Sequence, residues 1–176
     1  MDKVLIDYPK LMEMTTTVLG SCGALLVAND RQGKPNVMTI GWATYGIIWS
    51  KPMMLVLVRP SRYTYQFLEQ SDSFTVNLPP PEMAAVATYC GTVSGRTVDK
   101  FKEKDLTALR GQRVSASCIG ECSAHFECRI VHKNYVLPQL LDPEIIKGMY
   151  PQGDFHAIYY GEILAAYANK GLKLQV

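Results

Sequence analysis

Hydrophobic and polar positions follow one another along this chain in short runs, which predict strands more than long helices. The run Cys22–Ala28 is apolar, and Asn29–Pro35 after it is a dense cluster of turn-forming residues. Asn36–Trp49 then mixes β-branched, small and aromatic residues, so we predict a hairpin across that turn. Met53–Val58 follows a break at residues 50–52 and is apolar at every position, which indicates a strand covered on both faces.

After residue 60 the spacing of apolar positions changes to that of a helix, because Tyr63, Phe67 and Leu68 fall on one helical face. The elements predicted here are a short helix from Tyr63 to about Ser71, a strand over Phe74–Leu78, a helix from Pro81 to about Tyr89 with Gly91 as its C-cap, and a short helical piece at Val98–Phe101. Residues 1–20 are expected to form a lead-in with a short strand or helical turn.

The second half of the chain predicts two longer strands. Glu121–Ile130 alternates apolar and polar residues, which is typical of a half-buried strand, and Phe155–Tyr167 reads as a final long strand. Residues 138–154 contain three prolines and predict a loop with one helical turn. About six strands with a few short helices predict a mainly β protein, a closed and mostly antiparallel barrel.

Composition narrows the class of protein. The 176 residues fit a single domain over 1–176, and 48% apolar residues suffice for a core without metals or disulfides. A net charge of +2 gives little attraction to nucleic acid or an anionic membrane, and no apolar run reaches the ~18 residues of a span. The N-terminus lacks the features of a secretory signal, and five cysteines are typical of a reducing compartment, so we expect a cytoplasmic protein.

The strongest local signal is the turn Arg59–Thr64, with sequence Arg-Pro-Ser-Arg-Tyr-Thr. A buried strand delivers two guanidiniums and two hydroxyls into this turn, and phosphate groups bind such donors, especially at a helix N-terminus. The alternative is that Ser61 is only an N-cap and that both arginines are solvated.

Three further segments carry candidate chemistry. Asn36–Trp42 offers backbone donors, a glycine and an indole, which suit a flavin ring, although a plain strand with a core tryptophan is the alternative. Gly95–Phe101 contains two cations that would stabilise a phosphate or a reduced flavin, or would simply pair in a solvated loop. His156 stands at the mouth of the last strand, where it would position a proton or bond a carbonyl, or serve only structure.

Four residues raise the question of a metal site: Cys118, Cys122, His125 and Cys128. Their spacing differs from zinc knuckles and fingers, and strand alternation puts His125 on the face opposite Cys122 and Cys128. We therefore expect buried free thiols and no metal. The chain also lacks the glycine-rich dinucleotide, Walker, zincin and nucleophile-elbow motifs.

The order and spacing of these segments resemble the flavin reductase-like family, and most of all its flavoredoxin branch. The resemblance covers about residues 20–168 and rests on six motifs: Asn36-x-Met38-Thr39-x-Gly41-Trp42, Lys51-Pro52, Arg59–Thr64, Phe74-x-Val76-Asn77-Leu78-Pro79, Cys90–Phe101 and Gly153-Asp154-x-His156-x4-Gly161-Glu162. It implies an FMN-binding split β-barrel of antiparallel Greek-key type that works as a homodimer with non-covalent FMN.

The resemblance also implies roles for individual residues. The flavin ring would be lined by Asn36, Val37, Met38, Thr39, Ile40, Gly41 and Trp42. The phosphate would be held by Ser61, Arg62 and Thr64, with Arg59, Tyr63 and Arg96 beside them and Lys100 near ribityl or phosphate oxygens. Asn77 would be a supporting contact, and His156 would face the nicotinamide side as the catalytic candidate.

Two functions follow from this resemblance. In the first, the protein is an oxidoreductase whose FMN is reduced by NAD(P)H or a protein donor and passes electrons on. In the second, it is a non-enzymatic FMN electron carrier or redox sensor that docks a redox protein. Two-component reductases carry small hydroxyl residues where Gly41 and Trp42 stand here, and the bulky indole favours a tightly held FMN over an exchanging one. A cofactor-free barrel that binds single-stranded nucleic acid is disfavoured by the charge.

Overall fold

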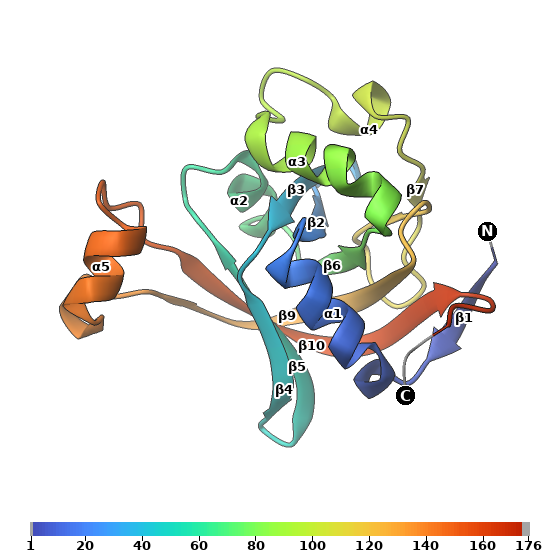
Figure 1. Ribbon diagram of the computed structural model, residues 1–176, viewed down its shortest axis with the longest axis horizontal. Coiled ribbons are helices and arrows are strands. Elements are labelled where there is room, and N and C mark those ends of the chain that lie inside the picture. The colour runs from blue at the N-terminus through green and yellow to red at the C-terminus, as the bar shows by residue number, and fades with distance from the viewer. Residues whose placement is uncertain (1, 174–176) are drawn as a thin grey trace.

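An eight-stranded antiparallel sheet is the centre of the computed structural model, which describes residues 2–173 (Figure 1). Its strand order is β3-β2-β6-β9-β10-β5-β4, and β1 pairs with β10. The strands are β1 (Lys3–Ile6), β2 (Ala24–Asn29), β3 (Pro35–Ile40), β4 (Ala43–Ile48), β5 (Lys51–Val58), β6 (Ser73–Leu78), β9 (Ala124–Tyr135) and β10 (Ala157–Asn169), while β7 (Ala108–Leu109) and β8 (Cys118–Ile119) form a separate pair.

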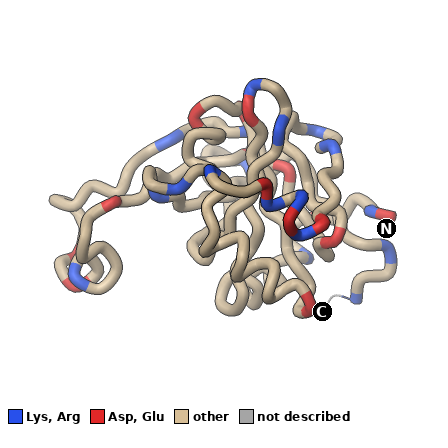
Figure 2. The backbone as a smooth tube through the Cα atoms, turned by 90° about the horizontal axis from the view of Figure 1, so that it is seen from above, with Lys and Arg blue, Asp and Glu red and all other residues tan. Residues whose placement is uncertain are grey.

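The helices are short. They are α1 (Met12–Gly20), α2 (Tyr63–Leu68), α3 (Ala84–Thr92), α4 (Lys100–Glu103) and α5 (Pro143–Met149), with 3-10 turns at Tyr8–Leu11, Pro81–Met83 and Pro138–Leu140. No helix among residues 2–173 is long and apolar enough to cross a bilayer. Acidic and basic residues are mixed along the backbone (Figure 2), as the small net charge leads one to expect.

The predicted mainly β, antiparallel architecture is confirmed, but the count of about six strands is wrong. The segment predicted as one strand over Asn36–Trp49 breaks at Gly41 and Trp42, so β3 pairs with β2 while β4 pairs with β5. Lys51 and Pro52, predicted as part of a break, belong to β5. The β4–β5 hairpin instead turns at Trp49 and Ser50, whose φ angles of 53° and 57° match the tight turns that suit a twisted hairpin.

The alternating strand near residue 125 was predicted to be half-buried, and this is wrong. The polar face of β9 is covered as well: His125 is 4% exposed and Glu127 is 0% exposed. Residues 110–118 cover this face, and the Glu127 carboxylate accepts the backbone N–H groups of Gln112 at 3.0 Å and Arg113 at 2.6 Å. A buried carboxylate is tolerable when it receives such bonds.

Helix α3 packs on β3 at the place where Gly91 allows close approach. A Cβ at Gly91 would lie 3.2 Å from the Cβ of Thr39, and the Thr39 hydroxyl donates to the carbonyl of Ala87 one turn earlier. The predicted C-cap at Gly91 is wrong, because α3 continues to Thr92 and Val93 is the capping residue. The glycine is needed here for packing and not for a turn.

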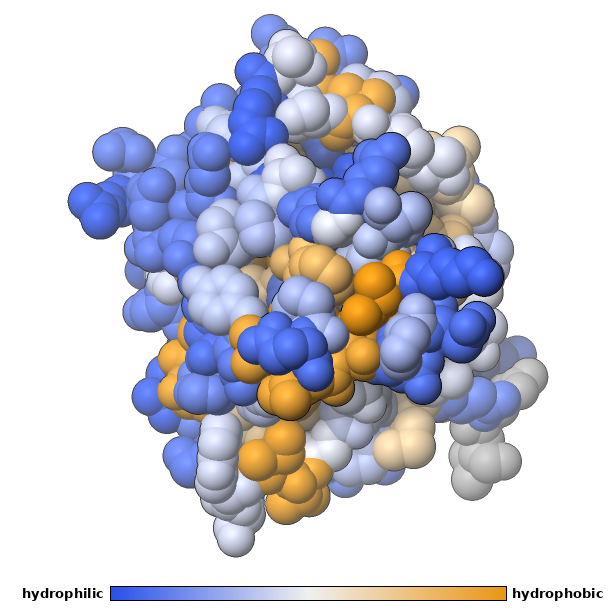
Figure 3. Space-filling view, turned by 90° about the vertical axis from the view of Figure 1, so that its left-hand side faces the viewer, coloured by the Kyte–Doolittle hydropathy of each residue, from blue (hydrophilic) through white to orange (hydrophobic). Residues whose placement is uncertain are grey.

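Strands β9 and β10 continue beyond the sheet as a two-stranded ribbon that carries α5 (Figure 1). We call residues 135–156 the arm. Seen from the arm side, apolar side chains gather on the surface of the molecule (Figure 3). Four exposed apolar residues of the arm are Leu137 at 43%, Leu140 at 80%, Ile145 at 46% and Met149 at 50%.

Candidate functional site

The break between β3 and β4 opens a cavity of about 180 Å³. Because Gly41 and Trp42 lie outside the strands β3 and β4, residues at the end of β5 and just before β10 also line this cavity. The cavity is lined by Met38, Thr39, Ile40, Gly41, Trp42, Leu57, Arg59, Arg62 and His156. Eight of these nine residues were predicted as site residues, and Leu57 was missed because it sits within the uniformly apolar run of β5.

One wall of this cavity is aromatic. The His156 ring lies 4.8 Å from the Trp42 ring, and Tyr150 meets the Trp42 ring edge-on at 6.1 Å. His156 Nδ1 lies 2.7 Å from the hydroxyl oxygen of Tyr150. Burial lowers the pKa of His156 to about 4, and the nearby guanidiniums of Arg59 and Arg62 lower it further than Asp154 raises it. His156 is therefore neutral at pH 7.

The start of the predicted anion turn is already engaged by the loop after α5. The Ser61 hydroxyl donates to the Asp154 carboxylate at 2.5 Å, and the Ser61 backbone N–H does so at 3.3 Å. Arg59 donates to the carbonyls of Met149, Gly153 and Asp154. Among the described residues, Ser61 and Arg59, two predicted phosphate donors, thus bind the arm. Asp154, which accepts from Ser61, has a φ of 57°.

A second group of predicted residues meets beside the N-terminal end of β3. Asn36 Nδ2 donates to the Thr64 hydroxyl at 2.8 Å. Lys100 is 5% exposed, and its Nζ donates to the carbonyls of Val37 at 2.9 Å and Cys90 at 2.6 Å. Burial lowers the pKa of Lys100 more than the Cys90 thiol raises it, and the Arg62 guanidinium lowers it further. No carboxylate of the described residues lies within 4.0 Å of this ammonium.

Two guanidiniums link this group to the cavity. Arg62 lines the cavity and donates to the carbonyl of Gly91 at 3.3 Å. Arg96 donates to the carbonyl of Ser61 at 3.1 Å, and its guanidinium lies over the Tyr63 ring, 5.1 Å from the centroid. Both guanidiniums bond only carbonyls in the described residues, so neither is neutralised by a carboxylate. Of the three cations, Arg62 lines the 180 Å³ cavity, and Lys100 lines a separate hollow of about 60 Å³. We call Arg62, Arg96 and Lys100, with the 180 Å³ cavity, the cleft.

Two predicted site residues lie away from the cleft. The side chain of Val37 is fully buried in a second core cluster, although its carbonyl accepts from Lys100. Asn77 is 0% exposed and bonds Leu25, Thr75 and Ile119 within the core. Sequence reasoning also missed Tyr150 and Asp154, because they lie in an irregular proline-containing loop where spacing carries no signal.

The cysteine-rich segment gathers a different set from the one considered in the sequence. Cys118, His125 and Glu127 offer ligand atoms within 4.8 Å of one another, while Cys128 packs in the main core. Both Glu127 oxygens already accept backbone N–H groups. The ammonium of Lys3 is close enough to lower the pKa of His125, after the larger effect of burial, and it opposes a cation there. These features suit a structural cluster.

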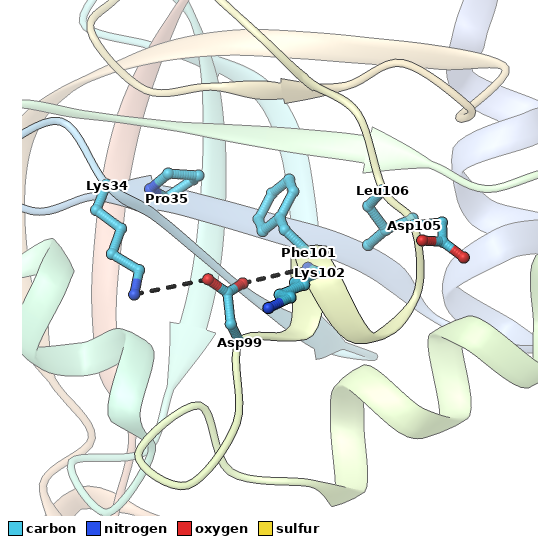
Figure 4. Close-up of a pocket in the computed structure, with 7 residues that line it drawn as sticks. All are labelled: Lys34, Pro35, Asp99, Phe101, Lys102, Asp105 and Leu106. Carbon is cyan, nitrogen blue, oxygen red and sulfur yellow. Dashed lines mark hydrogen bonds and ion pairs between the residues drawn. The ribbon is translucent and has the colours of Figure 1, made fainter.

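A larger hollow of about 440 Å³, drawn in Figure 4, shares no lining residue with the cavity beside His156. It is lined by Lys34, Pro35, Asp99, Phe101, Lys102, Asp105 and Leu106. Asp99 pairs with Lys34 at 3.6 Å, and both side chains are largely exposed. Opposite charges cancel across this open surface, so it would bind a charged ligand weakly. The cleft is the better candidate site.

Comparison with known proteins agrees with this geometry. The chain is 33% identical to a flavoredoxin from Methanosarcina acetivorans, with a TM-score of 0.67 over 86% of this chain and 70% of that one. It is 25% identical to the flavoredoxin of Desulfovibrio vulgaris (Miyazaki F), with a TM-score of 0.67 over 84% of this chain and 69% of that one.

A protein of Archaeoglobus fulgidus without an assigned function is 34% identical over 98 residues, which are 56% of this chain and 55% of that protein. The aligned region thus spans about half the length of that relative. The fold matches that of FMN-binding split-barrel structures, and the flavin reductase-like domain model matches residues 19–175. This chain belongs to the flavin reductase-like domain family.

Proposed function

We propose that this protein binds FMN non-covalently in the cleft and works as a flavin-dependent oxidoreductase. The observation that carries the proposal is Lys100, a buried ammonium that bonds two carbonyls and has no carboxylate partner among the described residues. A buried charge is costly unless a counter-charge joins it, and a phosphate monoester supplies one.

The residues present fit the two ends of FMN. Arg62, Arg96 and Lys100 give three cations toward the phosphate, and the Thr64 hydroxyl lies beside them. Met38–Trp42 and His156 supply an extended backbone and an aromatic wall for the ring. When bound, FMN would supply the hydride and electron chemistry, and the chain would position it and set its local charge.

We also propose that two copies complete the site. Ligand cavities usually measure about 300–1,000 Å³, and the 180 Å³ cavity is smaller than an FMN ring system needs. The arm beside the cavity exposes Leu137, Leu140 and Ile145, which a second copy would cover. Light scattering should then give twice the chain mass, and Leu140→Asp should shift the protein toward monomer. A monomeric wild type at micromolar concentration would refute this assembly.

The electron donor is either NAD(P)H or a reduced redox protein. The second candidate function is an electron carrier that exchanges electrons with a redox protein. The similarity to two flavoredoxins, at 25% and 33% identity, favours this candidate. Anaerobic mixing separates the two: rapid bleaching of the flavin band by NADH or NADPH selects the nicotinamide enzyme. Slow bleaching by both, with fast reduction by a ferredoxin-type donor, selects the electron carrier.

The decisive experiment is the absorption spectrum of the purified protein. We expect a yellow protein with a flavin spectrum and FMN released by denaturation, or a colourless protein that quenches the fluorescence of added FMN stoichiometrically. A colourless protein that also fails to bind FMN would refute the proposed function.

A further inference from the structure

The imidazole of His156 is held from outside the cavity by a residue that does not line it. Tyr150, 4% exposed, places its hydroxyl oxygen 2.7 Å from His156 Nδ1. His156 itself is 8% exposed and lines the cavity. Because Nδ1 is taken by Tyr150, the Nε2 edge of the ring is the one left for a ligand.

The direction of this hydrogen bond follows from what each partner can do. A neutral imidazole has one N–H donor and one bare nitrogen, while a phenol both donates and accepts. Burial raises the pKa of Tyr150 more than Arg59 lowers it, so the phenol keeps its proton. A hydrogen bond from the His156 backbone also lowers the pKa of Tyr150, so the phenol oxygen is the acceptor there and its proton is left to donate to Nδ1. The imidazole proton must then sit on Nε2.

The rings around this pair leave little freedom to rearrange. Phe155 stacks on Tyr150 with centroids 4.7 Å apart and planes inclined by 22°. Trp42 packs on the other side of His156 at 4.8 Å, and the Arg59 guanidinium lies 5.0 Å from the centre of the Tyr150 ring. The charged groups facing the imidazole are Arg59, Arg62 and Asp154. Burial first, and then two cations against one carboxylate, lower the pKa of His156 and keep the ring neutral at pH 7.

We propose that Tyr150 is a positioning residue that fixes His156 as the Nε2–H tautomer, so that His156 donates a hydrogen bond to a carbonyl-type oxygen in the cavity. The tautomer stands on the geometry of this chain alone. The identity of the acceptor, a carbonyl of a flavin or of its reaction partner, rests on the proposed function. No bond is made or broken by His156 in this role.

The test is long-range ¹H–¹⁵N correlation NMR of the histidine rings in the full-length protein, which contains three histidines. At pH 7 the wild type should show His156 with a protonated Nε2 and a bare Nδ1. In Tyr150→Phe the bond to Nδ1 is lost, so both tautomers should be populated and the pKa of His156 should rise. Tyr160→Phe is the matched control, because Tyr160 flanks a different imidazole, His132, at 5.0 Å.

A wild-type ring protonated on Nδ1 would overturn the proposal, as would an unchanged tautomer in a Tyr150→Phe variant with a wild-type circular dichroism spectrum. For the FMN-bound protein, Tyr150→Phe should slow reduction about ten-fold or more while changing the FMN dissociation constant less than two-fold. An unchanged rate would refute the proposed hydrogen bond from His156 to an acceptor oxygen in the cavity. A protein that does not bind FMN refutes the proposed function and leaves the tautomer measurement intact.

Discussion

Two polar regions of this barrel, one buried and one partly open to solvent, differ in how their side chains are bonded within the chain. On the polar face of β9, Glu127 bonds backbone N–H groups, and Asn77 of the neighbouring strand β6 bonds backbone and side-chain groups, while His125 Nδ1 is buried without a partner among the described residues. In the cleft, and among residues 2–173, the side chains of Lys100, Arg62 and Arg96 bond only carbonyls, and His156 Nε2 has no bonded partner. Buried polar groups normally find partners. The first region therefore holds the fold, and the second is where we propose that a ligand binds.

The largest expected effect comes from a mutation on the buried polar face of β9. Glu127→Leu removes the acceptor for two backbone N–H groups and should lower the free energy of unfolding by about 3 kcal/mol or more, measured by urea denaturation. Glu82→Leu, at an exposed carboxylate, is the matched control and should change stability little. If Glu127→Leu instead abolished FMN binding while stability stayed normal, the division into two regions would be wrong.

In the cleft, mutations should affect binding more than stability. Arg62→Ala combined with Thr64→Ala should weaken FMN binding more than ten-fold, because hydrogen bonds to a charged group are worth about 1.5–3 kcal/mol each. The measurement is fluorescence titration of the cofactor-free protein. Wild-type affinity in the double variant would refute the phosphate assignment.

Lowering the pH should reduce the stability of the fold through one buried histidine in each region. Burial lowers the pKa of both His125 and His156 to about 4. Since the unfolded chain binds protons near pH 6.5 and the folded chain does not, stability falls as the pH drops from about 6.5 toward 4. The two histidines together should cost about 2 kcal/mol between pH 7 and 5.5.

Denaturation curves at each pH check this dependence variant by variant. His156→Gln should remove about half of the acid-induced loss, while His132→Gln, at an exposed ring, should remove none. A wild type with equal stability at pH 7 and 5.5 would contradict the neutral, buried state of both rings.

The smallest effect expected is at Lys100. Lys100→Met removes one cation near the proposed phosphate and should weaken FMN about ten-fold, or about 1.4 kcal/mol. It also removes a buried charge without a carboxylate partner, so the cofactor-free protein should be as stable as the wild type or more so. Lys102→Met, on the exposed side of the same helix, is the control. Loss of stability without loss of affinity would make Lys100 a structural residue.

How much the sequence predicts depends on the range over which each feature is determined. The strands β2, β5, β6 and β10 were predicted close to their observed bounds because their apolar runs are local signals. The buried polar face of β9 was not, because the residues that cover it lie at 110–118 and carry no pattern that points to β9. The prediction of Gly91 as a C-cap was wrong for the same reason. A glycine is required there because Thr39, about fifty residues earlier in the chain, packs against it.

The site shows the same limit. The residues that line the cavity were nearly all named from motifs, because they sit in two short segments and one strand mouth. Asn77 was placed with them by resemblance, yet the structure shows its side chain bonded within the core. Tyr150 was missed, since only the folded loop brings its hydroxyl to the residue six positions later.

Tyr150 directly follows α5, and hydrogen bonds join the arm to the cavity, one between Tyr150 and His156 and the others from Arg59 to arm carbonyls. A contact that shifts the arm therefore changes the free energy of occupying the cavity. By thermodynamic linkage, occupancy of the cavity changes the free energy of that contact by the same amount. If a second copy covers the arm, as we propose, the apparent affinity for ligand becomes a function of protein concentration, and a dilution series reports the coupling between subunits.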